Sequence, residues 1–123
     1  RILLGTYVLS HGYYDAYYNK AVKIREKIKN EVGEVLKKVD LIATPTAPMT
    51  AFKIGEKMND PVAMYLCDIF SAPANLAGVP SIALPSGKNN NNLPYSIQFM
   101  ADHRAEKLLF DIGKKFESIK NNK

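Results

Sequence analysis

The sequence predicts an α/β domain in which helices cover a sheet, and three observations support this prediction. Two segments repeat apolar residues at steps of three and four, the periodicity of amphipathic helices; they span 14–39 and 108–119. Three apolar or alternating runs are too short for helices and favour strands; they span 41–44, 81–84 and 95–101. A joint over 75–85 connects helix to strand, since Gly78 suits the left-handed position after a helix and Pro80 prevents the helix from resuming.

The N-terminal part of the chain is predicted to be helical. Apolar residues among small ones predict a buried helix end over residues 1–9, which residues 10–12 interrupt. The long amphipathic helix follows, with lysines between its apolar positions, and we expect it to end at Asp40. Gly33 destabilises this helix by about 1 kcal/mol relative to alanine, which permits a kink or fraying at that position.

The middle of the chain alternates short elements with loops. After the strand at 41–44, Pro45 and Pro48 favour an extended loop, because each proline fixes its own φ angle. Residues 51–58 carry only a weak pattern, typical of a brief strand or an irregular connection. Asp60, followed by a proline, predicts a helix start with the aspartate as N-cap. This helix is expected to carry four apolar residues inward before the next proline interrupts it: Val62, Met64, Tyr65 and Leu66.

The last third of the chain predicts two paired strands and a helix. The run at 81–84 is expected to be a buried central strand closed by Pro85. The asparagine-rich segment 88–93 lacks core-forming side chains, which predicts a disordered or insertion-tolerant hairpin tip. Residues 95–101 form the partner strand, and Asp102 is expected to cap the final helix. That helix carries one apolar stripe: Leu108, Leu109, Ile112, Phe116 and Ile119.

Composition sets limits on the class of protein. The chain has 123 residues, 46% of them hydrophobic, which is enough for the core of one domain. It opens with Arg1 directly in an apolar helical pattern, so we expect a piece of a longer protein. No apolar run approaches the roughly 20 residues that a membrane-spanning helix needs, and we expect no membrane partner. The net charge of +5 is compatible with nucleic-acid binding, although solvated helix faces explain the same charge.

Two segments resemble the C-terminal core of the amidase-signature family: 40–48 and 75–85. In that family these elements bring two core strands side by side in a mixed sheet covered by helices. The resemblance implies that residues 1–123 are the C-terminal fragment of a single amidase domain, incomplete on its own, with 88–93 as a loop insertion. In such a fragment the strands at 41–44 and 81–84 should lack sheet neighbours and leave open edges, which are prone to pairing.

A narrower resemblance is to the A-subunit family of the glutamyl-tRNA(Gln) amidotransferases, and it covers nearly the whole chain. The segments that carry it are 4–10, 12–18, 51–56 and 60–65. It implies a parent enzyme that hydrolyses glutamine and passes ammonia to a B subunit, where ATP and Mg²⁺ are used to amidate misacylated glutamyl-tRNA. A C subunit holds the two together, and tRNA contacts mainly the B subunit. The chain itself is expected to hold no cofactor, and the compartment to be the bacterial cytoplasm, a mitochondrion or a plastid.

The resemblance also implies which site residues the chain carries. The family's nucleophilic serine, its cis-serine and its lysine lie in a glycine- and serine-rich segment that has no counterpart here, so we expect no catalytic residue and no activity from this chain alone. By position, Arg1 would bind the α-carboxylate of glutamine and Asp68 its α-ammonium group. Asp68 lies among apolar neighbours, and burying it unpaired would be costly, which favours a fixed partner. The alternative is that Asp68 caps the helical turn at 71–77.

Other reactive residues favour structural roles. Cys67 has no recognisable base partner and is expected to be a buried core thiol. His11 and His103 lie at predicted helix boundaries, where capping or exposure is the usual role. No His/Cys cluster has metal-ligand spacing. Four tyrosines at helical spacing favour core and edge packing over base stacking: Tyr13, Tyr14, Tyr17 and Tyr18.

Two alternative functions remain open at this point. The first is another amidase-signature hydrolase, which would not need both a carboxylate-binding arginine and an ammonium-binding aspartate. The second is a freestanding basic module that binds RNA, which would show steeply salt-dependent RNA affinity.

Overall fold

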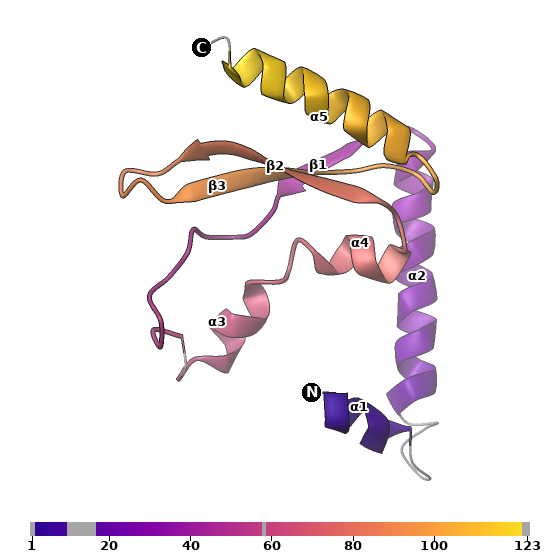
Figure 1. Ribbon diagram of the computed structural model, residues 1–123. Helices are drawn as coiled ribbons and strands as arrows, with labels where there is room; N and C mark the ends of the chain where they lie inside the picture. Colours follow the sequence, from indigo (N-terminus) through magenta and orange to yellow (C-terminus); the bar gives the residue numbers. More distant parts are fainter. Residues whose placement is uncertain (1, 10–16, 58, 122–123) are drawn as a thin grey trace.

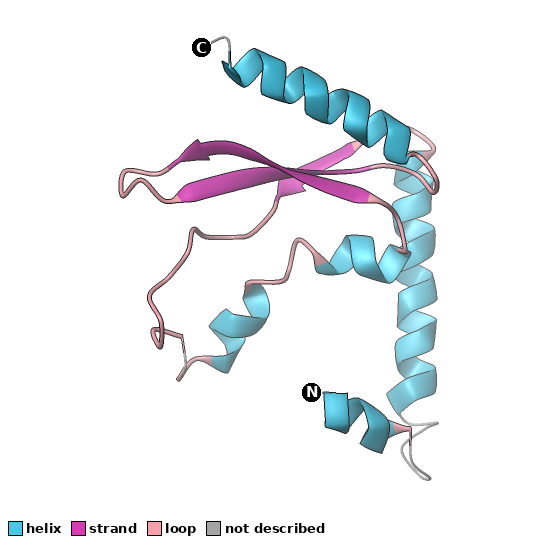
Figure 2. Ribbon diagram, in the orientation of Figure 1, coloured by secondary structure: helices cyan, strands magenta, loops and turns pink. Residues whose placement is uncertain are grey.

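The computed structural model describes residues 2–9, 17–57 and 59–121. Over these residues the chain forms, in order, α1 (Ile2–Val8), α2 (Asn19–Leu36), β1 (Ile42–Pro45), α3 (Pro61–Leu66), α4 (Ala72–Ala77), β2 (Ser81–Lys88), β3 (Pro94–Met100) and α5 (Glu106–Asn121). The predicted α/β class is therefore confirmed, with α5 on one side of the sheet and α3 and α4 on the other (Figures 1 and 2). No helix in the described ranges is long and apolar enough to cross a membrane.

The three strands form an antiparallel sheet in the order β1-β3-β2. Its register pairs Ile42 with Met100 on one side of β3 and Ser81 with Met100 on the other. The expectation that the strands at 41–44 and 81–84 lie side by side is wrong, because β3 lies between them. The local hairpin places β2 against one edge of β3, and β1 takes the other edge. Both outer strands are thus sheet edges within the described residues, as expected for a fragment.

Strand β2 differs from its prediction in position and length. Among the described residues it lies at an edge of the sheet rather than in its centre, and it continues through Pro85 to Lys88 with an irregularity in register between Pro85 and Gly87. A proline lacks the backbone N–H that a ladder needs, so it is tolerated in an edge strand and at a bulge.

The two N-terminal helices form as predicted but differ in their ends and burial. Helix α2 passes through Gly33 without interruption and ends at Leu36, four residues before Asp40. The backbone N–H of Lys37 donates to the Gly33 carbonyl at 3.1 Å, so the glycine causes no kink. Helix α1 is not buried by this chain, since the Leu3 side chain is 85% exposed. The expected helix start near residue 14 lies outside the described residues.

Helices α3 and α4 confirm the predicted start and stop signals. The Asp60 carboxylate accepts a hydrogen bond from the Ala63 N–H at 2.9 Å, which makes it the N-cap of α3. Gly78 follows α4 in the left-handed conformation, with φ 72° and ψ 29°. Helix α3 ends well before Pro73, which instead lies in the first turn of α4. The inward orientation expected for the apolar residues of α3 is wrong, because all four are exposed and Val62 is 67% exposed.

The side chain of Asn89 organises the hairpin tip. The Asn89 carboxamide oxygen accepts from the N–H groups of Asn91 and Leu93, and its Nδ2 donates to the Thr50 hydroxyl at 3.0 Å. The expected hairpin is confirmed, and its tip has a defined turn rather than a disordered one, because the Asn89 side chain bonds to the turn backbone as an Asx residue does. Its tolerance of insertions stays a prediction. Within the described part of 51–58 there is a turn and no strand.

The core lies on both faces of the sheet, where α5 packs on one face and α4 lies on the other (Figure 1). Its buried apolar residues are Leu36, Ala74, Ala77, Leu84, Met100, Ala101 and Leu109. The rings of Phe99 and Phe116 meet edge to face at 6.2 Å between centroids, which fixes α5 across β3. The apolar stripe of α5 is confirmed except at its end, where Ile119 is exposed. Asp102 does not cap α5, which begins at Glu106; its carboxylate accepts instead from the N–H of His103 at 2.7 Å.

Candidate functional site

The predicted ammonium-binding residue, Asp68, lies in the turn between α3 and α4. Its backbone carbonyl accepts hydrogen bonds from Ser71 N–H at 3.2 Å, Ala72 N–H at 3.0 Å and the Ser71 hydroxyl at 3.1 Å. Its own N–H donates to the Tyr65 carbonyl at 3.2 Å. The backbone of this turn is therefore well satisfied, and it holds Asp68 in a defined position between two helices.

The Asp68 carboxylate is exposed and, among the described residues, makes no hydrogen bond or ion pair. The expected burial of this charge is therefore not found among the described residues, and pairing with a partner outside them stays a prediction. The capping alternative is not borne out either, because the residue that precedes α4 is Ser71 and Asp68 contributes only its carbonyl. The flanking side chains of Leu66 and Ile69 are also exposed. Asp68 thus presents a carboxylate beside exposed apolar side chains. Its oxygens are negatively charged and can accept hydrogen bonds from a cationic group.

The second predicted site residue, Arg1, lies outside the described residues. Its role therefore stays a prediction, as does the binding role of Asp68.

The sheet anchors the turn that carries Asp68 through a buried amide that the sequence analysis did not single out. Gln98, in the central strand β3, is 5% exposed. Its Nε2 donates to the Phe70 carbonyl at 3.0 Å and lies 3.4 Å from the Thr44 hydroxyl of β1. The alternation of residues 95–101 places Gln98 on the same face as Ser96, so the sequence carried little signal that this side chain is buried.

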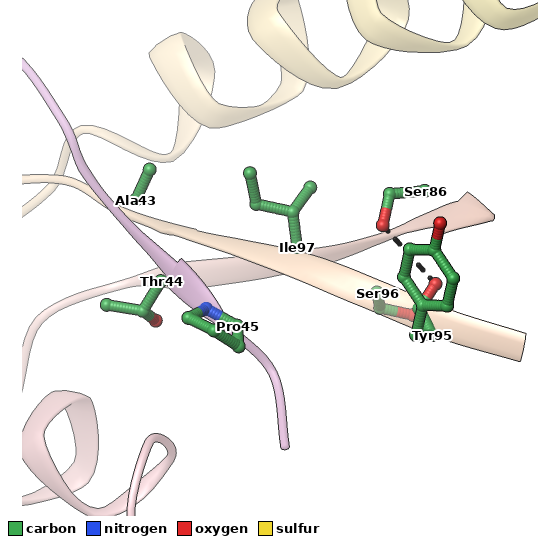
Figure 3. Close-up of a pocket in the computed structure, with 7 residues that line it drawn as sticks. All are labelled: Ala43, Thr44, Pro45, Ser86, Tyr95, Ser96 and Ile97. Carbon is green, nitrogen blue, oxygen red and sulfur yellow. Dashed lines mark hydrogen bonds between the residues drawn. The ribbon is translucent and has the colours of Figure 1, made fainter. Parts of the chain in front are cut away.

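A separate cavity of about 330 Å³ opens at the edge of the sheet where β1 meets β3 (Figure 3). It is lined by Ala43, Thr44, Pro45, Ser86, Tyr95, Ser96 and Ile97. The Ser86 hydroxyl donates to the Tyr95 carbonyl at 3.4 Å, and no lining residue is charged. None of these residues belongs to the turn with Asp68. The cavity suits apolar packing better than recognition of a zwitterionic amino acid.

The remaining candidates behave largely as structural residues. Cys67 is half-buried, and its thiol donates to the Ala63 carbonyl at 3.2 Å, one helical turn earlier. His103 is exposed, and His11 lies outside the described residues. Tyr17 is 59% exposed, which differs from the core packing expected of it. Tyr13 and Tyr14 lie outside the described residues. In the described ranges no three His, Cys, Asp or Glu side chains gather where they could hold a metal ion.

Comparison with known proteins gives a consistent result. The amidase family profile matches residues 1–110. The chain is 49% identical over 119 residues to the A subunit of the glutamyl-tRNA(Gln) amidotransferase of Thiobacillus denitrificans, which covers 97% of this chain and 24% of that protein. It is 54% identical over 113 residues to the protein of the same name from Pelagibacter ubique, covering 92% of this chain and 23% of that protein. The chain thus spans about a quarter of the length of these relatives.

Solved structures are similar to this chain over nearly its whole length, and it again covers only a quarter or less of each of them. The crystal structure of the A subunit of the glutamyl-tRNA(Gln) amidotransferase from Thermotoga maritima matches with a TM-score of 0.78 and 52% identity, over 92% of this chain and 25% of that one. The allophanate hydrolase of Kluyveromyces lactis matches with a TM-score of 0.75 and 26% identity, over 95% of this chain and 18% of that one.

Proposed function

This chain belongs to the amidase family, and from that premise we propose that it is the C-terminal part of the A subunit of a glutamyl-tRNA(Gln) amidotransferase. The observation that carries the proposal is a difference in identity. The chain is 49–54% identical to proteins of that name, over more than nine-tenths of its length. Against the allophanate hydrolase, which shares the fold, identity falls to 26%. An amidase of another specificity, or an RNA-binding module, accounts less well for this difference.

The proposed parent enzyme hydrolyses glutamine and supplies ammonia for the conversion of Glu-tRNA(Gln) to Gln-tRNA(Gln). Its partners are the B and C subunits, with tRNA bound mainly by the B subunit, where ATP and Mg²⁺ are used. The compartment is the cytoplasm in a bacterium, or a mitochondrion or plastid in a eukaryote. In this arrangement the nucleophilic serine, the cis-serine and the lysine belong to other parts of the parent protein, and this chain contributes fold core and one wall of the glutamine pocket.

The role proposed for Asp68 follows from its chemistry. Its carboxylate would accept hydrogen bonds from the α-ammonium group of glutamine, while the planar guanidinium of Arg1 would pair with the α-carboxylate. The two contacts together fix the amino-acid end of the substrate and thereby direct the side-chain amide toward the nucleophile. The free and exposed carboxylate in the turn after α3 supports this role.

The test compares two substrates in the full-length protein assembled with its partner subunits. We expect Asp68→Ala to lower kcat/KM for ammonia release from glutamine by about 10- to 100-fold, the range expected for hydrogen bonds to a charged group. Hydrolysis of butyramide, which lacks both charged groups, should stay within about 2-fold. Glu117→Ala, which removes an exposed carboxylate from α5, is the matched control. Unchanged glutamine kinetics in Asp68→Ala would refute the assignment, and preferred turnover of butyramide by the unaltered enzyme would indicate an amidase of different specificity.

A further inference from the structure

We propose that Gln98 is a positioning residue for glutamine recognition, because it fixes the turn that carries Asp68 to the central strand of the sheet. The inference rests on the proposed function of Asp68. It concerns a residue that touches no substrate and acts through another.

The first support is the cost of placing this amide where it is. Gln98 lies in β3 with Thr44 of β1 opposite it on one side and Ala83 of β2 on the other. A carboxamide at such a buried position is unfavourable unless its polar atoms are bonded, and an apolar side chain would serve a purely structural purpose as well. Its Nε2 donates two hydrogen bonds, a shorter one of 3.0 Å to the Phe70 carbonyl and a longer one of 3.4 Å to the Thr44 hydroxyl.

The second support is the position of the acceptor, Phe70, in the turn that carries Asp68. Phe70 is two residues after Asp68 in the same turn, and it is 28 positions away from Gln98 in the sequence. The other hydrogen bonds of the turn are local and connect it only to α3, to α4 or to itself. Among the described residues, Gln98 is thus the only side chain of the sheet that hydrogen-bonds to this turn. Its loss would leave the internal shape of the turn intact while releasing its position relative to the sheet.

The consequence is specific to substrates that Asp68 contacts. A site needs its contacting groups held to within about 0.5 Å, and that precision depends on the residues behind them. Freeing the Phe70 carbonyl should let the Asp68 carboxylate drift and weaken its contact with an ammonium group. It should not change the chemistry performed on an amide that has no ammonium group.

The experiment uses Gln98→Met in the full-length protein with its partner subunits, because methionine keeps the length of the side chain and removes the donor. We expect KM for glutamine to rise about 10-fold, equivalent to about 1.4 kcal/mol, with kcat and the hydrolysis of butyramide within about 2-fold. Ser96→Ala is the matched control, since Ser96 lies on the same strand and the same face and its hydroxyl makes no hydrogen bond among the described residues.

A double variant tests whether Gln98 acts through Asp68. Once Asp68→Ala has removed the carboxylate, adding Gln98→Met should cause no further loss of glutamine turnover. Additive losses, or an equal loss for glutamine and butyramide, would overturn the inference and assign Gln98 a general structural role. If Asp68→Ala impairs glutamine turnover and Gln98→Met does not, the positioning role is wrong and the proposed function stands. If Asp68→Ala has no effect, both fail together.

Gln98→Glu provides a second variant of the same shape should Gln98→Met fold poorly. A glutamate at this position can donate to the Phe70 carbonyl only when it is protonated. Relative to the unaltered enzyme, its glutamine-to-butyramide selectivity should therefore recover as the pH is lowered. A selectivity that does not depend on pH and equals that of the unaltered enzyme would overturn the proposal.

Discussion

Two glycines should respond in opposite directions to the same substitution. Gly78 has a φ of 72°, and a Cβ built on it would come no closer than 3.9 Å to any heavy atom outside its neighbours, the Cε1 of His103. The cost of Gly78→Ala is therefore backbone strain alone, about 1–2 kcal/mol for a left-handed residue with a side chain. Gly33 lies inside α2, has no positive φ, and a Cβ there would meet nothing within 4 Å. Gly33→Ala should accordingly stabilise the protein by up to about 1 kcal/mol.

The two variants should thus differ in free energy of unfolding by about 1–3 kcal/mol, although each adds one methyl group. In urea unfolding of the full-length variants, the midpoint of Gly33→Ala should lie above that of the unaltered protein and the midpoint of Gly78→Ala below it. Gly78→Asn should fall between Gly78→Ala and the unaltered protein, because asparagine tolerates the left-handed region better than alanine. A stabilising Gly78→Ala would refute the left-handed turn between α4 and β2. A destabilising Gly33→Ala would show that α2 is closely covered at Gly33.

Three further predictions concern capping, charge and the hairpin tip. Asp60→Ala should destabilise the protein by about 1 kcal/mol through loss of the N-cap of α3, and Asp60→Asn by less, as measured by urea unfolding. The hydrogen bond from Lys107 at 2.6 Å lowers the pKa of Asp111 below its ordinary value of 3.8. The contribution of this exposed pair is therefore present above the unfolded-state pKa and is lost as pH falls through the folded-state pKa. NMR titration should show the depressed pKa, and Lys107→Gln should raise it toward the ordinary value without fully restoring it, because Lys114 and Lys115 also lower it. Asn89→Ala should speed hydrogen exchange at the Leu93 amide, because this amide donates to the Asn89 side chain. An unchanged exchange rate would contradict that hydrogen bond.

Local chemistry explains which parts of the fold were predictable. The N-cap at Asp60 and the left-handed Gly78 depend on bonds and torsions within a few residues, and both are found where the sequence indicates. The apolar stripe of α5 follows from periodicity and packs on the sheet as expected. The prediction that Asp102 caps α5 was wrong, because an aspartate near a helix start can accept from an adjacent N–H instead of a helix N–H.

Features that depend on distant partners were not predictable in this way. Apolar residues such as Leu3 and Val62 indicate a buried face, but burial requires a packing partner, and both side chains are exposed in the described part of the chain. The same reasoning placed Asp68 in an apolar environment, whereas its turn is open on the side of the carboxylate. The order of the strands and the bond from Gln98 to the Phe70 carbonyl depend on contacts between distant parts of the sequence, which periodicity and turn signals do not encode.

The central position of β3 also has a consequence for the order of folding. Strands β2 and β3 are joined by a short hairpin, so their pairing requires closure of a small loop and should form early. Strand β1 pairs with β3 across a much longer loop, with Thr44 and Gln98 54 positions apart, and should dock later because closing that loop costs more chain entropy. Gln98 also donates a hydrogen bond to the Phe70 carbonyl, and Phe70 belongs to the segment that connects β1 to β2. We therefore expect the turn with Asp68 to be fixed only after the hairpin exists, so that this turn is among the last described parts of the chain to become native.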